Sequence, residues 1–436
     1  MRKAKLALWI LTAALAITAC GGREKKKEVP VTESSQETAA TEATEPTTLA
    51  PATDEEKKQA EEVGKKIDAI YVQNWSENTE QLCKEAKEAW DALSDSAKAA
   101  VTGEHASPEY FGLGTGDAAK DDPRNQDEIG EKELLVVSFG TSYNDSRARD
   151  IGGIESYLAR EFPDYSVRRA FTSQIIINHI LARDGEKIDN VEQALERAKK
   201  NGVKELIVQP THLMQGKEYD ELKATLDQHR ADFTKVALAE PLLGEVGKTA
   251  EDVNADKEKV ATLLVQAAVA DSGFDSVQKV GQDRAAFVFL GHGTSHTAAI
   301  TYSEMQTAMR KLGFNNVFIG TVEGEPEETA VDAVIAAVKK AGFKRVTIRP
   351  MMVVAGDHAH NDMAGAEDDS WVQKFVASKN FDRVETQILG MGGISDIEKI
   401  YAAHTQAAIY EAEGVAETTA AETAAAETTA GESQTN

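Results

Sequence analysis

The chain has only two cysteines among its 436 residues, Cys20 and Cys83. They lie in different contexts, one behind an N-terminal apolar stretch and one in a helical pattern, so a disulfide between them is not expected. No CxxC pair and no Cys/His spacing typical of a zinc site is present. A metal site in this chain would therefore have to use histidine and carboxylate side chains.

Basic residues are also scarce. There are 48 Lys and Arg against 73 Asp and Glu, which gives a net charge of -25. No nucleic-acid partner is expected, because a phosphate backbone is bound by clusters of Lys and Arg. The chain is nevertheless 41% hydrophobic, and it is long enough to form more than one domain around a sizeable core.

Motifs for nucleotide binding and for serine activation are missing. Residues 244–249 read GEVGKT, but two residues separate the glycines where a P-loop needs four. Gly140, Thr141 and Ser142 lack the GxSxG spacing of a nucleophilic serine. No GxGxxG follows an apolar run in a dinucleotide-binding context. ATP-driven chemistry therefore has no support in the sequence.

The N-terminal apolar stretch, residues 6–18, is too short to span a bilayer comfortably. It follows a basic N-terminus and ends in small residues before Cys20, an order that resembles a bacterial lipobox. We predict a lipoprotein signal peptide over 1–20 and lipidation of Cys20, which would anchor the protein to the cell membrane outside the cytoplasm. The alternative is an ordinary cysteine in a short signal anchor.

Four further segments differ from the central part of the chain in composition. Residues 21–53 and 411–436 are polar, low-complexity stretches that cannot bury enough apolar surface to order, and we predict disorder for both, as a linker and an acidic tail. Residues 54–102 carry apolar side chains at helical spacing and predict a small helical module. Residues 103–130 are rich in Gly, Asp, Pro and Asn and predict a second linker.

The core, about 131–410, alternates short apolar runs with amphipathic stretches, which predicts helices packed on parallel sheets. It contains an internal repeat, because LLVVSFGTS matches FVFLGHGTS, and KNGVKELIVQPTHLMQGKEYDEL matches KAGFKRVTIRPMMVVAGDHAHNDM. We therefore predict two similar Rossmann-like or flavodoxin-like α/β lobes around a cleft, an N-terminal lobe over 131–275 and a C-terminal lobe over 276–410. The alignment pairs three positions of the two halves: Phe139 with His292, Ser173 with Glu323, and Glu218 with His358.

Three polar residues of the second half, His292, Glu323 and His358, each lie just past a predicted strand. The carboxyl ends of parallel strands meet at one edge of a sheet, so these side chains should converge there. Two imidazoles and a carboxylate suit a divalent first-row metal such as Co, Ni, Fe or Zn, although each residue alone could equally be structural. His212, His296 and His360 are weaker candidates for the same cleft.

These motifs are long enough to indicate a family. The segments LLVVSFGTSYNDSR, VQPTHLMQGKEYD, GHGTSHTA, GTVEGEP and MMVVAGDHAHNDMAGAEDDSW resemble the anaerobic sirohydrochlorin cobaltochelatases, CbiK-type class II chelatases. The resemblance implies the class II chelatase fold and ATP-independent insertion of Co²⁺ into sirohydrochlorin during anaerobic cobalamin synthesis. It implies that His292, Glu323 and His358 bind the metal, and that His292 also accepts a proton. The metal would then be a substrate, with Fe²⁺ or Ni²⁺ as alternatives, and no further cofactor is expected.

The remaining expectations concern the tetrapyrrole and the setting of the reaction. Hydroxyl and guanidinium groups near the predicted strand ends are candidates for binding the tetrapyrrole by position: Ser138, Thr141, Ser142, Arg147, Thr294 and Ser295. The expected partners are a tetrapyrrole, a divalent metal and, through the lipid anchor, a membrane; a homo-oligomer remains open. Because cobalamin precursors are made in the cytoplasm, the alternative function is an exported lipoprotein that binds a metal, haem or another tetrapyrrole without turnover.

Overall fold

The computed structural model describes residues 50–112 and 114–414. The predicted signal peptide, the lipidation site Cys20, nearly all of the linker 21–53 and the tail from 415 onward lie outside the described residues. Within the described part of the chain, no helix is both long enough and apolar enough to cross a membrane.

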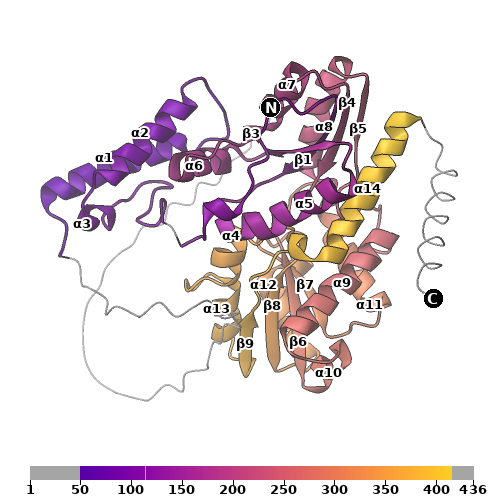
Figure 1. The fold of residues 1–436 in the computed structure, drawn as a ribbon. Coiled ribbons are helices and arrows are strands. Elements are labelled where there is room, and N and C mark those ends of the chain that lie inside the picture. Colours follow the sequence, from indigo (N-terminus) through magenta and orange to yellow (C-terminus); the bar gives the residue numbers. More distant parts are fainter. Residues whose placement is uncertain (1–49, 113, 415–436) are drawn as a thin grey trace, which may run out of the picture.

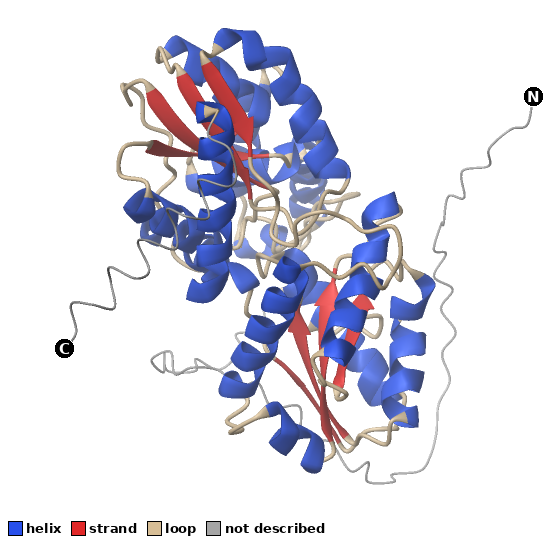
Figure 2. Ribbon diagram, turned by 90° about the vertical axis from the view of Figure 1, so that its right-hand side faces the viewer, coloured by secondary structure: helices blue, strands red, loops and turns tan. Residues whose placement is uncertain are grey.

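Two parallel sheets form two lobes, each with helices on both faces (Figures 1 and 2). The first sheet has the order β3-β2-β1-β4-β5 and the second the order β7-β6-β8-β9. Leaving out the short edge strand β3, the two orders are the same, so the prediction of two similar parallel-sheet lobes is confirmed. The strands are β1 (Lys132–Ser138), β2 (Ser166–Phe171), β3 (Asp189–Asn190), β4 (Glu205–Pro210), β5 (Lys235–Leu238), β6 (Ala285–Gly291), β7 (Val317–Thr321), β8 (Arg345–Pro350) and β9 (Arg383–Thr386).

The central strands β1 and β6 are almost wholly buried, which explains their continuous apolar sequences, since helices cover both faces of a parallel sheet. In the first lobe the covering segments are α4 (Asn144–Ser146), the π-helical turn η2 (Arg147–Ile151), α5 (Gly152–Glu161), α6 (Gln174–Asp184), α7 (Val191–Lys200), α8 (Lys217–His229) and η3 (Arg230–Asp232). In the second they are α10 (Val277–Gln282), η4 (Thr297–Ala299), α11 (Ile300–Lys311), η5 (Glu327–Thr329), α12 (Val331–Lys340), the π-helical turn η6 (Ala359–Met363) and α13 (Trp371–Ala377). The short helix η7 (Met391–Gly393) contacts η2 and α5 of the first lobe.

The helices that follow the last strand of each sheet change lobes. Helix α9 (Ala255–Asp271) packs on α11 of the second lobe, where Lys257 forms a buried ion pair with Glu304 at 3.1 Å. Helix α14 (Ser395–Glu413) returns to the first lobe and packs on α5, β4 and β5 (Figure 1). The predicted lobe boundary at 275/276 is therefore wrong. Helix α9, before the boundary, packs on the second lobe, and helix α14, after it, packs on the first lobe. The predicted tail also begins too early, since the helix continues to Glu413.

The N-terminal module consists of α1 (Asp54–Ile70), α2 (Thr79–Asp91) and α3 (Asp95–Lys98), and it packs against α6 of the first lobe (Figure 1). The segment 103–130, which contains the short helix η1 (Ala118–Lys120), is not a loose linker. Its Tyr110 and Phe111 are buried in the core of the module. The side chain of Asp121 is fully buried between two arginines of the first lobe.

Candidate functional site

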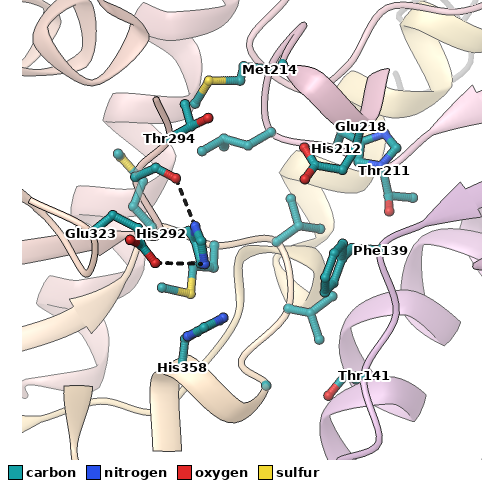
Figure 3. A pocket seen from close by; sticks show the side chains of 18 of the residues that line it. Phe139, Thr141, Thr211, His212, Met214, Glu218, His292, Thr294, Glu323 and His358 are labelled. Atoms are coloured by element: carbon teal, nitrogen blue, oxygen red, sulfur yellow. Dashed lines mark hydrogen bonds and ion pairs between the residues drawn. The ribbon is translucent and has the colours of Figure 1, made fainter. Parts of the chain in front are cut away.

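A cavity of about 630 Å³ lies between the lobes, at the carboxyl ends of both sheets. Residues after β1 and β4 line it from the first lobe, and residues after β6, β7 and β8 line it from the second. Figure 3 shows His292, Glu323 and His358 on one side of this cavity, with Phe139, His212 and Glu218 across from them. The fold thus brings together the three side chains that the sequence placed at strand ends.

His292 directly follows β6, and both of its neighbours are glycines for steric reasons. A Cβ atom on Gly291 would lie 2.3 Å from the ring of Tyr302, and one on Gly293 would lie 2.8 Å from Glu323. Gly293 also has a φ of +92°, which favours glycine. The Nδ1 atom of His292 lies 2.8 Å from its neighbour's carbonyl oxygen, and this contact assigns the proton to Nδ1 and leaves Nε2 as a free acceptor.

Glu323 is held beside His292 by the backbone. Its N–H donates to the carbonyl oxygen of His292 at 2.9 Å, which continues the pairing of β7 with β6 beyond the strand ends. The carboxylate Oε1 lies 3.9 Å from Nε2 of His292, as the dashed line in Figure 3 marks. The two donor atoms are therefore close, and the backbone fixes the positions from which they point.

His358 directly precedes the π-helical turn η6, a rare helical form that often occurs at functional sites. Its Nδ1 lies 2.6 Å from the carboxylate of Asp362, one turn further along. This carboxylate orients the ring and leaves Nε2 available. The ring centroid of His358 is 4.4 Å from that of His292, with the planes at 75°.

The three side chains form an open array. Within residues 50–112 and 114–414, no group of three or more His, Cys, Asp or Glu side chains, this array included, is placed so that it could hold a metal ion. The side chains of His292, Glu323 and His358 are 47%, 55% and 41% exposed, respectively. A structural metal site is closed by its protein ligands, so this exposure fits an ion that enters and leaves.

The candidate tetrapyrrole ligands divide into two groups. Thr141, Ser142, Thr294 and Ser295 line the cavity. Ser138 does not, because it is buried in the sheet and accepts a hydrogen bond from the Thr211 hydroxyl at 2.7 Å.

Arg147 does not line the cavity either. It is fully buried in η2, where its Nε donates to Asp121 at 2.7 Å. The same carboxylate accepts from Arg169 at 2.6 Å. Burial opposes ionisation of Asp121, but Arg169 and then Arg147 outweigh it and hold the pKa of this carboxyl below its usual value. The expectation that Arg147 binds substrate is therefore wrong, because its charge is neutralised inside the first lobe.

The cavity lining has an unusual charge balance. Among the described residues it contains four carboxylates, Glu218, Glu323, Glu325 and Asp357, and neither lysine nor arginine. Such a lining attracts divalent cations. Carboxylates of a bound organic ligand must then be met by hydroxyl and backbone N–H donors, or must extend into water.

Three cavity features were not identified as functional from the sequence. Phe139, the counterpart of His292, is 46% exposed and presents an aromatic face to the cavity (Figure 3). Met351 and Met352 follow β8 and form an apolar part of the lining. Glu218, the counterpart of His358, also reaches the cavity, whereas Ser173 caps α6 and does not. The sequence contained one signal for Phe139, because the internal repeat aligns this aromatic residue with His292.

Two weaker histidine candidates, His296 and His360, do not line this cavity. His296 lies 3.3 Å from Asp220 and lines a smaller neighbouring pocket. His360 stacks on Tyr143 with a centroid distance of 4.2 Å, and its Nδ1 lies 2.9 Å from the carbonyl oxygen of Gly356. Neither belongs to the array of His292, Glu323 and His358.

Two parallel-sheet lobes with a cleft between their strand ends define a class of α/β proteins that hold a ligand between the lobes. Residues 132–410 match the family model described as "Cobalt chelatase (CbiK)". The sirohydrochlorin cobaltochelatase of Salmonella typhimurium is 34% identical over 279 residues, which cover 64% of this chain and 97% of that relative. The sirohydrochlorin cobaltochelatase CbiKC of Nitratidesulfovibrio vulgaris is 30% identical over 256 residues, or 59% of this chain and 83% of the relative. The chain therefore belongs to the cobalt chelatase (CbiK) family.

Solved structures give weaker likenesses. SirB from Bacillus subtilis with Fe³⁺ has 15% sequence identity and a TM-score of 0.44, over 65% of this chain and 98% of SirB. The sirohydrochlorin chelatase SirB from Bacillus subtilis subspecies spizizenii in complex with cobalt has 13% identity and a TM-score of 0.41, over 65% and 98% of the two chains.

Proposed function

We propose that this protein is a sirohydrochlorin cobaltochelatase, which inserts Co²⁺ into sirohydrochlorin without ATP. The observation that carries the proposal is the relationship to the Salmonella enzyme over 97% of its length. The cleft adds a physical basis for it, since His292, Glu323 and His358 offer three metal donors on one wall of a cavity. The function is therefore an ion transfer within a single cleft.

The metal is a substrate in this reaction. Nε2 of His292, Nε2 of His358 and the Glu323 carboxylate form a nitrogen and oxygen donor set that suits divalent first-row metals. Co²⁺ is the proposed ion, with Fe²⁺ and Ni²⁺ as competitors, because this donor set alone discriminates poorly among them. An ion held on one wall faces a macrocycle bound against the other, so transfer becomes a positioned step.

His292 serves in two successive roles. While the ion is bound, the Nε2 lone pair is a ligand. When the ion moves onto the macrocycle nitrogens, that lone pair is released and can accept a proton from a pyrrole N–H. Imidazole suits this step because its usual pKa of about 6.5 lies near neutrality. Thr141, Ser142, Thr294 and Ser295 would donate hydrogen bonds to the carboxylates of the substrate.

The test is a direct assay of insertion. Purified protein is mixed with sirohydrochlorin and Co²⁺, Fe²⁺ or Ni²⁺, and the absorption spectrum is followed. We expect conversion to the cobalt complex, and a loss of at least about a hundredfold in rate for His292→Ala. Absence of conversion with every metal would reject the chelatase. Full activity of His292→Ala would reject the role of that residue.

We also propose that the protein is a lipoprotein anchored outside the cytoplasm through Cys20, supported by the basic, apolar and small-residue order before this cysteine. Fatty-acid labelling of cells should mark the wild type and not a Cys20→Ser variant. This location favours a second candidate function, capture of a metal or haem without turnover. Tight haem or Co²⁺ binding together with no insertion would establish that function instead.

A further inference from the structure

His212 lies on the first-lobe wall of the cavity and does not belong to the array of His292, Glu323 and His358. The backbone on both sides of it is held by hydrogen bonds. His212 follows β4, and its carbonyl oxygen accepts from the N–H of Leu242 at 3.1 Å. The preceding carbonyl, of Thr211, accepts from the hydroxyl of Tyr401 at 3.0 Å. The side chain lines the cavity beside Glu218, across from His292 (Figure 3).

The imidazole of His212 is unusual because both of its ring nitrogens are buried and neither has a hydrogen-bond partner within the described ranges. Unpaired buried polar atoms cost free energy, about 1–3 kcal/mol each, and are rare without a functional reason. Burial lowers the pKa of His212 to about 4, while the charge of Glu218 acts in the opposite direction. The ring is therefore neutral near pH 7, with an unused lone pair.

Metal insertion needs more than one proton acceptor. Two pyrrole N–H bonds break, four nitrogen–metal bonds form as the ion leaves its protein donors, and two protons leave the macrocycle for each ion inserted. His292 can accept one of them. Because His292 lies on the metal side of the cleft, a proton that leaves the opposite face of the macrocycle needs an acceptor on the first-lobe wall, where His212 and Glu218 lie.

We propose that His212 accepts the second pyrrole proton from the opposite face of the macrocycle and passes it to the carboxylate of Glu218, which releases it to water. This inference rests on the proposed chelatase function and adds a residue to it. The soft χ2 torsion of histidine lets the ring turn a nitrogen toward the substrate. Glu218 stabilises the transient imidazolium by its charge, and the low intrinsic basicity of the ring favours rapid onward transfer.

His179 provides a matched control for burial. Burial also lowers its pKa to about 4, and its Nε2 likewise has no hydrogen-bond partner in the described part of the chain. It lies outside the cavity, stacked on Tyr110 with a centroid distance of 4.4 Å. Replacing it perturbs a buried imidazole without affecting the cleft.

The first experiment compares His212→Gln with His179→Gln in the cobalt insertion assay at saturating sirohydrochlorin and Co²⁺. We expect kcat to fall about a hundredfold for His212→Gln with both KM values within threefold of the wild type, and to stay within twofold for His179→Gln. Unchanged kcat, or a loss confined to KM, would overturn the proton role. If the wild-type protein itself inserts no metal, the proposed function fails first.

The second experiment separates proton transfer from packing. His212→Gly, checked for native circular dichroism, is assayed with added imidazoles and small amines of similar volume but different pKa. Rescue of kcat that rises with the pKa of the added base supports a proton acceptor. Rescue that follows only the volume of the added molecule, or no rescue in a natively folded variant, would contradict it.

Discussion

The two lobes share one strand order and differ at three equivalent positions around the same cleft. The second lobe carries His292, Glu323 and His358. The first carries Phe139 and Glu218 at the cavity, and Ser173 away from it. One wall thus carries two imidazoles and a carboxylate, and the other an aromatic face with a buried imidazole. In the proposed function, the ion is held on the first of these walls and the macrocycle lies against the second.

The difference between the lobes also extends to what stabilises them. Buried charges in the first lobe form a network in which Asp121 joins Arg147 and Arg169. That carboxylate comes from the segment behind the helical module, so the module is tied into the first lobe. Among residues 50–112 and 114–130, none lines the cavity beside His292, Glu323 and His358.

The largest expected effect tests the second-lobe wall. His358→Ala removes a metal donor and should lower the rate of cobalt insertion by at least about a hundredfold. His360→Ala is the control, since that ring stacks on Tyr143 outside the cavity, and it should stay within fivefold. Insertion kinetics followed by absorbance measure both variants. A similar loss of insertion rate in both variants would contradict the assignment of His358, rather than its neighbourhood, as a metal donor.

The next effect concerns the stability of the first lobe. Asp121→Ala leaves Arg147 buried with one remaining carboxylate partner, Glu186 at 3.4 Å, and should lower the free energy of unfolding by about 3 kcal/mol. Glu221→Ala removes an exposed ion pair with Lys217 and should cost less than about 0.5 kcal/mol. Urea unfolding followed by circular dichroism distinguishes the two. Equal stability would show that the network is not needed by the lobe.

A smaller effect on metal affinity is expected for Asp362, whose carboxylate contacts the ring of His358. Asp362→Asn weakens the contact that orients His358, and it should reduce affinity for Co²⁺ by about tenfold or more. Asp368→Asn, at an exposed position on the same loop, should leave affinity unchanged. Isothermal titration calorimetry with Co²⁺ alone measures this affinity in the absence of the tetrapyrrole. An unaltered Kd for Asp362→Asn would mean that the ring holds its orientation without this carboxylate.

The smallest effect separates macrocycle binding from metal binding. Phe139→Ala removes aromatic surface from the first-lobe wall and should raise KM for sirohydrochlorin about tenfold, with Co²⁺ affinity unchanged. Trp75→Ala is a fair control, because Trp75 is 45% exposed, close to the 46% of Phe139, and does not line the cavity. A change in Co²⁺ affinity for Phe139→Ala would contradict the division of roles between the walls.

The repeat, the strand ends and the convergence of His292, Glu323 and His358 at the cleft could be predicted from the sequence, because periodic apolar runs and motif spacing are local signals. The sequence could not show that Arg147 is buried, since its partner Asp121 lies in a segment whose composition resembles a linker. It also could not show that α9 and α14 exchange lobes, because helix packing depends on which apolar face is left uncovered in three dimensions. The absence of lysine and arginine from the described cavity lining is likewise visible only once distant segments are assembled.

The most direct test of the asymmetric cleft is diffraction at the cobalt absorption edge from crystals of the protein soaked in Co²⁺. We predict an anomalous peak in the cleft, within about 2.0–2.3 Å of donor atoms of His292, Glu323 and His358. A peak held instead by Glu218 and His212 of the first lobe, or no peak in the cleft at all, would contradict the account.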